Sequence, residues 1–549
     1  MYSNKESVNI LTALLISHGI RHAVVCPGSR NAPIVHNLNE CVDIKCHAVT
    51  DERSAGFYAL GMAQALSEPV VVCVTSGTAL LNVLPAVAEA WYQHQPLIIV
   101  SADRPQQWIG QLDGQTLPQP DALGRFVCQA VSLPEIPMAS VDKELRWHCN
   151  RLVNEALLTA KDNSRPVHIN VPISEPLFTF NVSSLPDERT IVRYTPPADY
   201  GILPIELVDG LVAAQRPMIV FGQSNPNEFE GDGVDWLFSH VIVLHEALSP
   251  FPSVSHFDEV LFQGKIEHPD FILYIGDCIV SKRLRHFLRN AEGAVTWRVS
   301  RSGDIEDTFQ NLRGLVVGDA DFVLQSLNEK MRNRSFAGKD YRRQWLHLLK
   351  QAGDHALSYE PHYSQMAAVR EFENQLNDIN CTVHYANSSA IRLANIYAAH
   401  HVWCNRGVNG IEGSLSTACG CSLVSQGRVY CIIGDLSFFY DQNAFWNQEL
   451  TGNLRVLLLN NGCGGIFRQL SGLAQSPAAD RFVSARHHTT AEGICSQNNI
   501  SYQTAHDTDS LCNGINWLLS HESDRPMLLE VLTDADDDAL QLENYYKSL

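Results

Sequence analysis

The stretch that decides the fold is RVYCIIGDLS at residues 428–437, followed by LRVLLLNNG at residues 454–462. Each part opens with an apolar run long enough for one buried strand and ends in polar residues. Because parallel strands covered on both faces are apolar throughout, the pattern predicts two neighbouring parallel strands with a helical segment between them. It places Asp435 and Asn461 at the carboxyl edge of one sheet, where α/β proteins bind ligands.

The same rhythm recurs along the whole chain and predicts three α/β domains, each a doubly wound parallel sheet, at residues 1–182, 198–335 and 358–549. The apolar strand candidates lie at 22–29, 69–77, 96–105 and 166–173, then at 217–223, 240–247, 271–277 and 294–300, and finally at 382–389, 401–407, 428–435, 454–462 and 526–533. A proline- and charge-rich stretch at 183–201 predicts a linker.

Composition narrows the class of protein. The 549 residues are 45% apolar and 18% charged, as expected of a globular protein with several cores. The formal charge of −20 disfavours binding to nucleic acid or to anionic membranes. Since no apolar run approaches the length of a membrane span and the first residues do not resemble a signal peptide, we expect a cytoplasmic protein with no membrane insertion.

Asp435 and Asn461 offer oxygen ligands, and Mg²⁺ commonly combines protein oxygens with the phosphates of a cofactor. Gly434 and Asp435, followed about 25 residues later by two asparagines, resemble the thiamine-diphosphate motif, although Leu436 stands where that motif usually has glycine. The alternative is that Asp435 only caps a helix. A noncatalytic, doubly wound nucleotide-binding or interaction protein is a further alternative, but the chain has no G-x-G-x-x-G or P-loop pattern.

Glu52, in the segment TDERSAGFYALGMA at 50–63, follows a short strand candidate and begins a predicted helix. Thiamine-dependent enzymes need a carboxylic acid beside N1′ of the aminopyrimidine, so that the cofactor can deprotonate its own thiazolium ring. Glu52 resembles that glutamate, and TSGTALLN at 75–82 resembles the glycine-containing turn after the next strand. The alternative for Glu52 is a favourable interaction with the helix dipole, worth about 0.3–1 kcal/mol.

The resemblance becomes closer when further segments are added. Similar segments lie at 26–33 (CPGSRNAP), 74–90 (VTSGTALLNVLPAVAEA), 98–105 (IIVSADRP), 405–420 (NRGVNGIEGSLSTACG), 434–441 (GDLSFFYD) and 460–467 (NNGCGGIF). Together they resemble the 2-succinyl-5-enolpyruvyl-6-hydroxy-3-cyclohexene-1-carboxylate synthase family of menaquinone biosynthesis, in which GDLS replaces GDG. The resemblance implies that 2-oxoglutarate adds to thiamine diphosphate and loses CO₂, and that the resulting four-carbon carbanion equivalent adds to isochorismate. Another thiamine-diphosphate 2-oxo-acid decarboxylase, or an acetolactate-synthase-like carboligase, is the alternative.

The same resemblance implies a role for individual residues and names the domains pyrimidine-binding, central and diphosphate-binding. Glu52, Arg30, Ser29 and Gln115 would be catalytic, and Mg²⁺ or Mn²⁺ would be held by Asp435, Asn461 and the backbone carbonyl of Cys463. The cofactor would contact Thr78, Ser388, Ile411, Gly434, Leu436, Ser437, Ile466 and Phe467. Both substrates are anions, and they would bind Arg104, Lys282, Arg392 and Arg406, since guanidinium groups suit carboxylates. A homodimer is the minimum assembly that the resemblance implies, and a homotetramer also fits.

Overall fold

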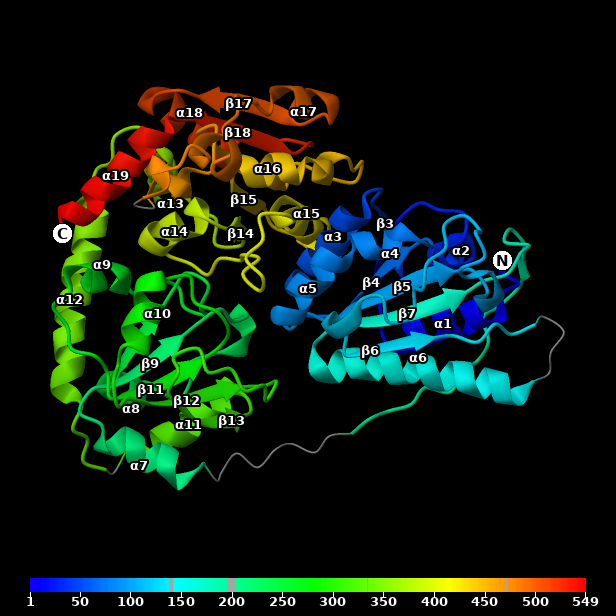
Figure 1. The fold of residues 1–549 in the computed structure, drawn as a ribbon, viewed down its shortest axis with the longest axis horizontal. Helices are drawn as coiled ribbons and strands as arrows, with labels where there is room; N and C mark the ends of the chain where they lie inside the picture. The colour runs from blue at the N-terminus through cyan, green and yellow to red at the C-terminus, as the bar shows by residue number, and fades with distance from the viewer. Residues whose placement is uncertain (138–141, 195–202, 333, 470–471) are drawn as a thin grey trace.

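The structure is a computed structural model that describes residues 1–137, 142–194, 203–332, 334–469 and 472–549. Three parallel sheets organise three units, drawn from blue to cyan, in green, and from yellow to red in Figure 1. A separate antiparallel pair joins β1 (Tyr2–Ser3) to β8 (Phe180–Val182), next to the first unit. Within the described ranges, no helix is both long and apolar enough to span a membrane.

The first sheet has the strand order β3-β2-β4-β5-β7-β6. Its strands are β2 (His22–Val25), β3 (Lys45–Ala48), β4 (Val70–Val74), β5 (Leu97–Asp103), β6 (Gln129–Ser132) and β7 (Val167–Pro172). One face is covered by α1 (Glu6–Ser17), α2 (Ala32–Glu40) and α6 (Lys143–Asn163), and the other by α3 (Glu52–Leu66), α4 (Thr78–Asn82) and α5 (Leu84–Tyr92). The chain leaves β2 for β3 on one side and then for β4 on the other, so the ends of β2 and β4 form a switch point that suits a ligand.

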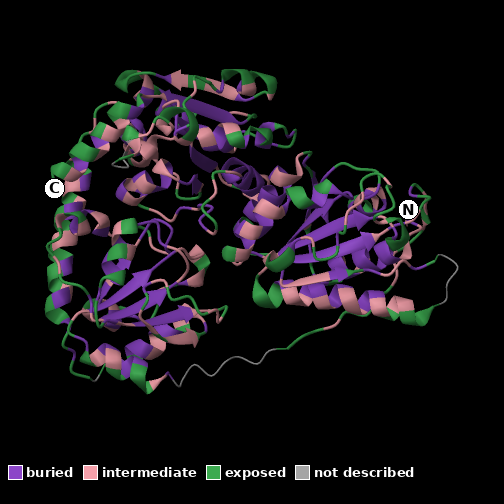
Figure 2. Ribbon diagram, viewed as in Figure 1, coloured by how far each residue is buried: buried purple, intermediate pink, exposed green. Residues whose placement is uncertain are grey.

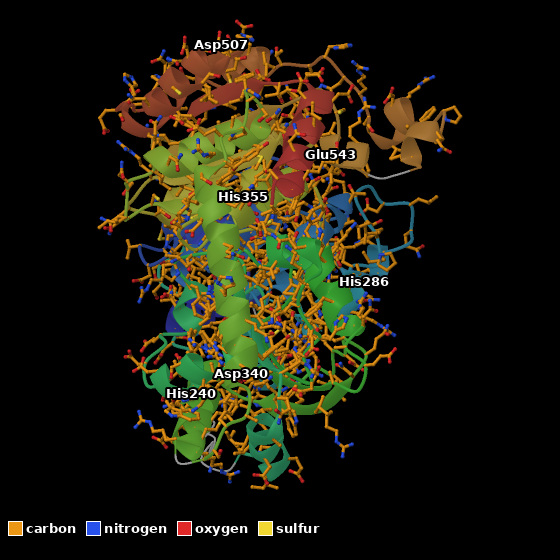
Figure 3. All side chains as sticks on the ribbon, turned by 90° about the vertical axis from the view of Figure 1, so that its left-hand side faces the viewer. His240, His286, Asp340, His355, Asp507 and Glu543 are labelled. Atoms are coloured by element: carbon orange, nitrogen blue, oxygen red, sulfur yellow. The ribbon has the colours of Figure 1, made fainter. Side chains whose placement is uncertain are left out.

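The second sheet has the order β10-β9-β11-β12-β13. Its strands are β9 (Pro217–Phe221), β10 (Ile242–His245), β11 (Phe271–Ile275), β12 (Val295–Ser300) and β13 (Leu312–Val317). The helices of this unit are α7 (Ile205–Ala213), α8 (Asp235–His240), α9 (Phe257–Gln263), α10 (Lys282–Arg289) and α11 (Ala320–Met331). The long helix α12 (Lys339–Ser358) then runs from this unit to the third. Figure 3 shows its Asp340 end near His240 of α8 and its His355 end beside the C-terminal helix.

The third sheet has the order β14-β15-β16-β18-β17. Its strands are β14 (Thr382–Tyr385), β15 (Val429–Gly434), β16 (Leu454–Asn460), β17 (Ser501–Ala505) and β18 (Met527–Leu532). The helices are α13 (Gln365–Gln375), α14 (Ser389–Tyr397), α15 (Ser414–Val424), α16 (Asp435–Tyr440), α17 (Glu492–Gln497), α18 (Thr508–Ser520) and α19 (Ala535–Lys547). As expected of parallel sheets with both faces covered, the central strands are buried along their length, which Figure 2 shows in purple.

The α/β class with parallel sheets is confirmed, but some predicted elements are wrong. The segment 401–407 was predicted as a strand but is not one. Among the described residues, it pairs with a neighbouring strand only through a single parallel bridge between Trp403 and His384. The sequence does not reveal the short strands β1 and β8 of the antiparallel pair. In the parallel sheets it does not reveal β6, β13 and β17, which lie at sheet edges and are only partly buried, so they need no apolar run. The domain limits stay predictions, and the predicted start at 198 and the linker residues 195–201 lie outside the described residues.

The first and third units meet where α3 packs against α15 with almost no side chain between them. A Cβ atom added at Gly61 would lie 1.9 Å from the carbonyl oxygen of Thr417, and one added at Gly420 would lie 2.0 Å from that of Tyr58. The close approach joins both cores into one apolar cluster that includes Val72 of β4 and Cys431 of β15. These glycines therefore set the distance between the two units.

We expect Gly61→Ala to destabilise the protein, because the added methyl group has no space against the α15 backbone and overpacking typically costs about 1–3 kcal/mol. The midpoint of urea denaturation measures the change. Gly493→Ala in α17 is the matched control, since nothing lies within 4 Å of its Cβ position. Equal denaturation midpoints for the two variants would show that the helices tolerate a wider spacing.

Candidate active site

Asp435 lies at the carboxyl edge of the third sheet, between two strands that pair in parallel. It is the first residue of α16 directly after β15, and only 3% of it is exposed. One carboxylate oxygen accepts a hydrogen bond from the N–H of Leu436 at 2.7 Å, and the other accepts one from the N–H of Cys463 at 3.1 Å. The turns after β15 and β16 are thus joined through Asp435. The imidazole Nε2 of His487 lies 3.5 Å from the same carboxylate.

Asn461 follows β16 and is oriented by a partly buried acid. Its amide nitrogen donates to Asp538 Oδ2 at 2.8 Å, so the amide oxygen is directed away from Asp538 and accepts only a weak bond from the Cys463 thiol at 3.8 Å among the described residues. Asp538 also accepts from the N–H of Gln365 and the hydroxyl of Thr533, and burial raises its pKa to about 6. Burial likewise raises the pKa of the Cys463 thiol, which therefore stays protonated. A backbone carbonyl is then the natural ligand at residue 463.

The oxygen atoms of Asp435, Asn461 and the backbone at residue 463 suit a hard cation that also binds oxygens of a cofactor or of water. In the part of the chain that the structure describes, no three His, Cys, Asp or Glu side chains gather where they could hold a metal ion by themselves. One carboxylate, one amide oxygen and one carbonyl are the kind of incomplete oxygen set that Mg²⁺ or Mn²⁺ completes with phosphate groups and water. Among the described residues, no atom lies within 4 Å of the Cβ position of Gly434, beside Asp435, which leaves space at this edge.

The predicted cofactor contacts of the third unit surround this edge. The Ser437 hydroxyl donates to the carbonyl of Ile411, whose side chain is 41% exposed. Leu436 and Phe467 lie on either side of Gly464, whose Cβ position is 2.9 Å from the Phe467 ring and 3.4 Å from Leu436. Two more predicted residues flank the edge, Ser388 before α14 with φ of 74°, and Ile466, partly buried in the short helix 465–469.

The loop 404–411 carries both Arg406 and Ile411, and all three units hold it. From the third unit, Asn387 donates to the carbonyls of Asn405 and Gly410 and accepts from Arg406 Nη1 at 3.1 Å. From the second unit, Gln223 donates to the Cys404 carbonyl at 2.9 Å and the Cys278 thiol to the Arg406 carbonyl at 3.0 Å. From the first unit, Glu89 accepts the N–H groups of Gly407 and Val408, each at 2.7 Å.

Two predicted arginines lie near each other at the carboxyl edge of the first sheet, Arg30 after β2 and Arg104 directly after β5. Arg30 is 6% exposed and donates to the Ile173 carbonyl at 2.9 Å, while Arg104 donates to the Gly114 carbonyl at 2.9 Å. Burial lowers the pKa of Arg30, and the nearby charge of Arg104 lowers it further. Three other predicted residues of this unit, Ser29, Thr78 and Gln115, are exposed, and the Gln115 backbone packs 3.3 Å from the Cβ position of Gly77.

Glu52 is the first residue of α3 and is partly buried. Its carboxylate accepts from the Asn82 amide at 3.4 Å, and no hydrogen bond among the described residues joins it to Asp435, Ser437 or Asn461. Its neighbour Arg53 donates to the Tyr440 carbonyl, at the end of α16 opposite to Asp435. Within one chain, the start of α3 therefore contacts the far end of the helix that Asp435 begins.

Arg392 of α14 lines a cavity of about 920 Å³ between the second unit, α14 and α19. Its Nε atom is buried and has no hydrogen-bond partner among the described residues, and the same holds for Arg406. Burial lowers the pKa of Arg392, and the charge of Arg406 adds to this effect, so the two guanidinium groups lie near each other. Lys282, by contrast, is exposed on α10 and does not line this cavity, although Ser281 and Arg283 do.

Several residues that shape the site were not predicted. Glu89, Asn387 and Asp538 orient predicted residues, and Glu246 lines the cavity beside Arg392. Glu246 is 2% exposed and accepts from the N–H groups of Val280 and Ser281, and its burial raises its pKa to about 7. Glu89 lies in the segment 74–90, which resembles the family, but the sequence pattern does not distinguish a single acid in a predicted helix from a surface residue.

Comparison with known proteins adds independent information. The family model described as thiamine pyrophosphate enzyme, N-terminal TPP binding domain, matches residues 6–123. The chain is 42% identical to the 2-succinyl-5-enolpyruvyl-6-hydroxy-3-cyclohexene-1-carboxylate synthase of Bacteroides thetaiotaomicron over 100% of both chains. It is also similar to proteins of that name from Phocaeicola vulgatus, at 41% identity over 100% of this chain and 99% of the relative, and from Porphyromonas gingivalis, at 34% over 99% and 97%.

Proposed function

This chain belongs to the family of 2-succinyl-5-enolpyruvyl-6-hydroxy-3-cyclohexene-1-carboxylate synthases, thiamine-diphosphate-dependent enzymes of menaquinone biosynthesis, and from this premise we propose how its residues perform the reaction. The substrates are 2-oxoglutarate, which is decarboxylated, and isochorismate, which receives the four-carbon fragment. The observation that carries the proposal is the similarity to relatives of this name over the full length of the chain. It favours this activity over that of another thiamine-diphosphate decarboxylase or carboligase.

Thiamine diphosphate, when bound, supplies the electron sink for the decarboxylation. Asp435, Asn461 and the Cys463 carbonyl would hold Mg²⁺ or Mn²⁺ against its diphosphate, and Ser388 and Ser437 would contact the same group. Glu52 would share a proton with N1′ of the aminopyrimidine. Leu436, Phe467 and Ile411 would provide apolar contacts, with Ile411 supporting the bent conformation that brings the reacting atoms of the cofactor together.

The arginines would bind and orient the carboxylates of the substrates. Arg30 and Arg104 lie near each other at the carboxyl edge of the first sheet, and Arg392 and Arg406 lie near each other in the third unit. The buried Nε atoms of Arg392 and Arg406, which have no hydrogen-bond partner among the described residues, support this role, because a buried N–H without an acceptor is costly until a ligand supplies one. Ser29 and Gln115 would donate hydrogen bonds to substrate. Lys282 would require α10 to move closer, since it is exposed and outside the cavity beside Arg392.

We infer that two copies of the chain complete each site. The start of α3 contacts the end of α16 opposite to Asp435, which favours a pairing of Glu52 with the metal-binding edge of a second chain. Large apolar side chains are also exposed on elements that carry predicted site residues, with Leu81 of α4 42% exposed and Tyr440 of α16 51% exposed. Leu81 adjoins Asn82, which bonds Glu52, and the Tyr440 carbonyl bonds Arg53, so both exposed residues lie beside the start of α3.

Glu52→Gln is expected to retain its affinity for thiamine diphosphate and to lose turnover by at least about 100-fold, because the amide cannot share the proton at N1′. Titration calorimetry measures the affinity, and consumption of isochorismate with 2-oxoglutarate measures the rate. Glu68→Gln, at an exposed position two residues after the end of the same helix, is the matched control. Full activity in Glu52→Gln would remove this residue from catalysis, and product from pyruvate but not from 2-oxoglutarate would contradict the proposed donor.

Asp435→Ala is expected to abolish the Mg²⁺-dependent binding of thiamine diphosphate, because it removes the only carboxylate of the proposed ligand set. Calorimetry with and without Mg²⁺ gives the measurement directly. Asp509→Ala, at an exposed position of α18, controls for the loss of one acidic residue. If Asp435→Ala bound the cofactor with the Mg²⁺ dependence of the unmodified protein, the metal site would lie elsewhere.

Light scattering of the purified protein is expected to give at least twice the 61.0 kDa mass of one chain. Leu81→Asp should shift the assembly toward the monomer, because it places a charge on the apolar surface proposed to bind the second copy. Leu357→Asp on α12, where the leucine is 76% exposed, is the control and should leave the mass unchanged. A monomeric unmodified protein that is fully active would overturn the shared site.

A further inference from the structure

A buried carboxylate of the first unit holds the loop that carries Arg406 and Ile411. Glu89 lies near the end of α5 and is 3% exposed. Its Oε1 accepts from the N–H of Gly407 at 2.7 Å and its Oε2 from the N–H of Val408 at 2.7 Å, across 318 and 319 residues of sequence. The side-chain amide of Gln93 donates to Oε1 at 2.5 Å. Three donors therefore converge on one carboxylate.

This arrangement suits a carboxylate and no other side chain. Two consecutive backbone N–H groups point at the two oxygens, so both terminal atoms must accept, which only an acid can do. A glutamine would set its own NH₂ group against one of the loop N–H groups. Burial raises the pKa of Glu89, while the hydrogen bonds from Val408, Gln93 and Gly407 oppose that rise.

Glycine at 407 lets the loop come this close. A Cβ atom there would lie 2.9 Å from the Glu89 carbonyl oxygen and 2.9 Å from Tyr92 Cβ. The backbone of the loop thus rests directly on α5, and the bond to Glu89 is made at the residue after Arg406. A shift of this contact would move the Arg406 side chain, because only one peptide unit separates them.

Glu89 differs in kind from the other anchors of the loop. Gln223, Cys278, Asn387 and Ser437 all donate to loop carbonyls, whereas Glu89 accepts the two N–H groups that follow Arg406. Arg406 itself donates from Nη1 to Asn387, and its buried Nε has no hydrogen-bond partner in the part of the chain that the structure describes. The guanidinium is therefore held in place with a donor left for a ligand.

We propose that Glu89 is a positioning residue for the reaction: by holding Gly407 and Val408 it fixes Arg406 toward the substrate carboxylate and Ile411 toward the cofactor. The inference rests on the proposed function for the roles of Arg406 and Ile411. The part of the proposal that concerns the immobilisation of the loop 404–411 can be measured without any ligand. A residue that acts through Arg406 should lose its effect when Arg406 is removed, whereas one that only stabilises the fold should not.

The first measurement is hydrogen exchange of the segment 404–411 in the full-length protein without ligands. Glu89→Gln is expected to speed amide exchange at Gly407 and Val408 by at least about tenfold, since one of the two N–H groups loses its acceptor and faces an NH₂ group instead. Gln93→Met is the matched control, because it removes the third donor and leaves both loop bonds in place. Unchanged exchange in Glu89→Gln would overturn the proposal, whatever the reaction of the enzyme.

The second measurement is a double-mutant cycle with Glu89→Gln and Arg406→Ala, read as kcat and KM for each substrate. Glu89→Gln is expected to lower kcat/KM by up to about 100-fold, mainly through KM, as a small displacement of a positioning group does. In the Arg406→Ala background, the same change should cost less than about threefold. Effects that multiply would overturn the proposal and leave Glu89 with a structural role alone.

Folding and function are controlled separately. Urea denaturation of each variant shows how much of the protein is folded, and Glu89→Asp, which keeps both acceptor oxygens, is expected to restore part of the exchange protection that Glu89→Gln loses. If Glu89→Gln does not fold, Glu89→Asp carries both measurements, with smaller effects in the same direction. Absence of turnover in the unmodified protein would refute the proposed function, and the exchange result would still decide whether Glu89 immobilises the loop.

Discussion

The contact between α3 and α15 is the constraint on which the other contacts depend. At Gly61 and Gly420 the two helices meet backbone against backbone, so the first and third units share one core rather than an interface of long side chains. Such a contact allows little adjustment, because protein interiors are close-packed. It brings the start of α3 to the end of α16 and places α5 against the loop 404–411. A side chain as short as that of Glu89 can therefore bridge the units.

Positively charged side chains cluster locally although the chain as a whole is acidic. The protein has a net charge of −20, yet guanidinium groups gather in pairs, with Arg30 near Arg104 and Arg392 near Arg406. In each pair, burial and then the charge of the neighbouring guanidinium lower the pKa of one arginine, Arg30 or Arg392, which is unfavourable for the protein without a ligand. Nearby acids offset part of this, since Glu175 contacts Arg30 and Glu246 lies close to Arg406. A ligand with several carboxylates would relieve the repulsion further.

How much the sequence reveals depends on whether a feature is local. The central strands β15 and β16, the helix beginning at Glu52 and the placement of Asp435 beside the turn after β16 follow from apolar runs and the residues that end them. The edge strands β6, β13 and β17 lack such runs, because one side faces solvent or loops. The hydrogen bonds of Glu89 with Gly407 and of Asp538 with Asn461 join residues far apart in the sequence, so no local pattern predicts them.

The segment 401–407 shows how the start of a loop can resemble a strand in the sequence. It is apolar at its start, and Trp403 does form one bridge with β14, but the residues after it find their partners elsewhere. Buried backbone groups must be satisfied, and here side chains of the three units satisfy them instead of a neighbouring strand. A ladder would have turned successive side chains to opposite faces of the sheet. Side-chain anchors instead allow Arg406 and Ile411 to be directed independently, as the proposed contacts of Arg406 with substrate and of Ile411 with the cofactor require.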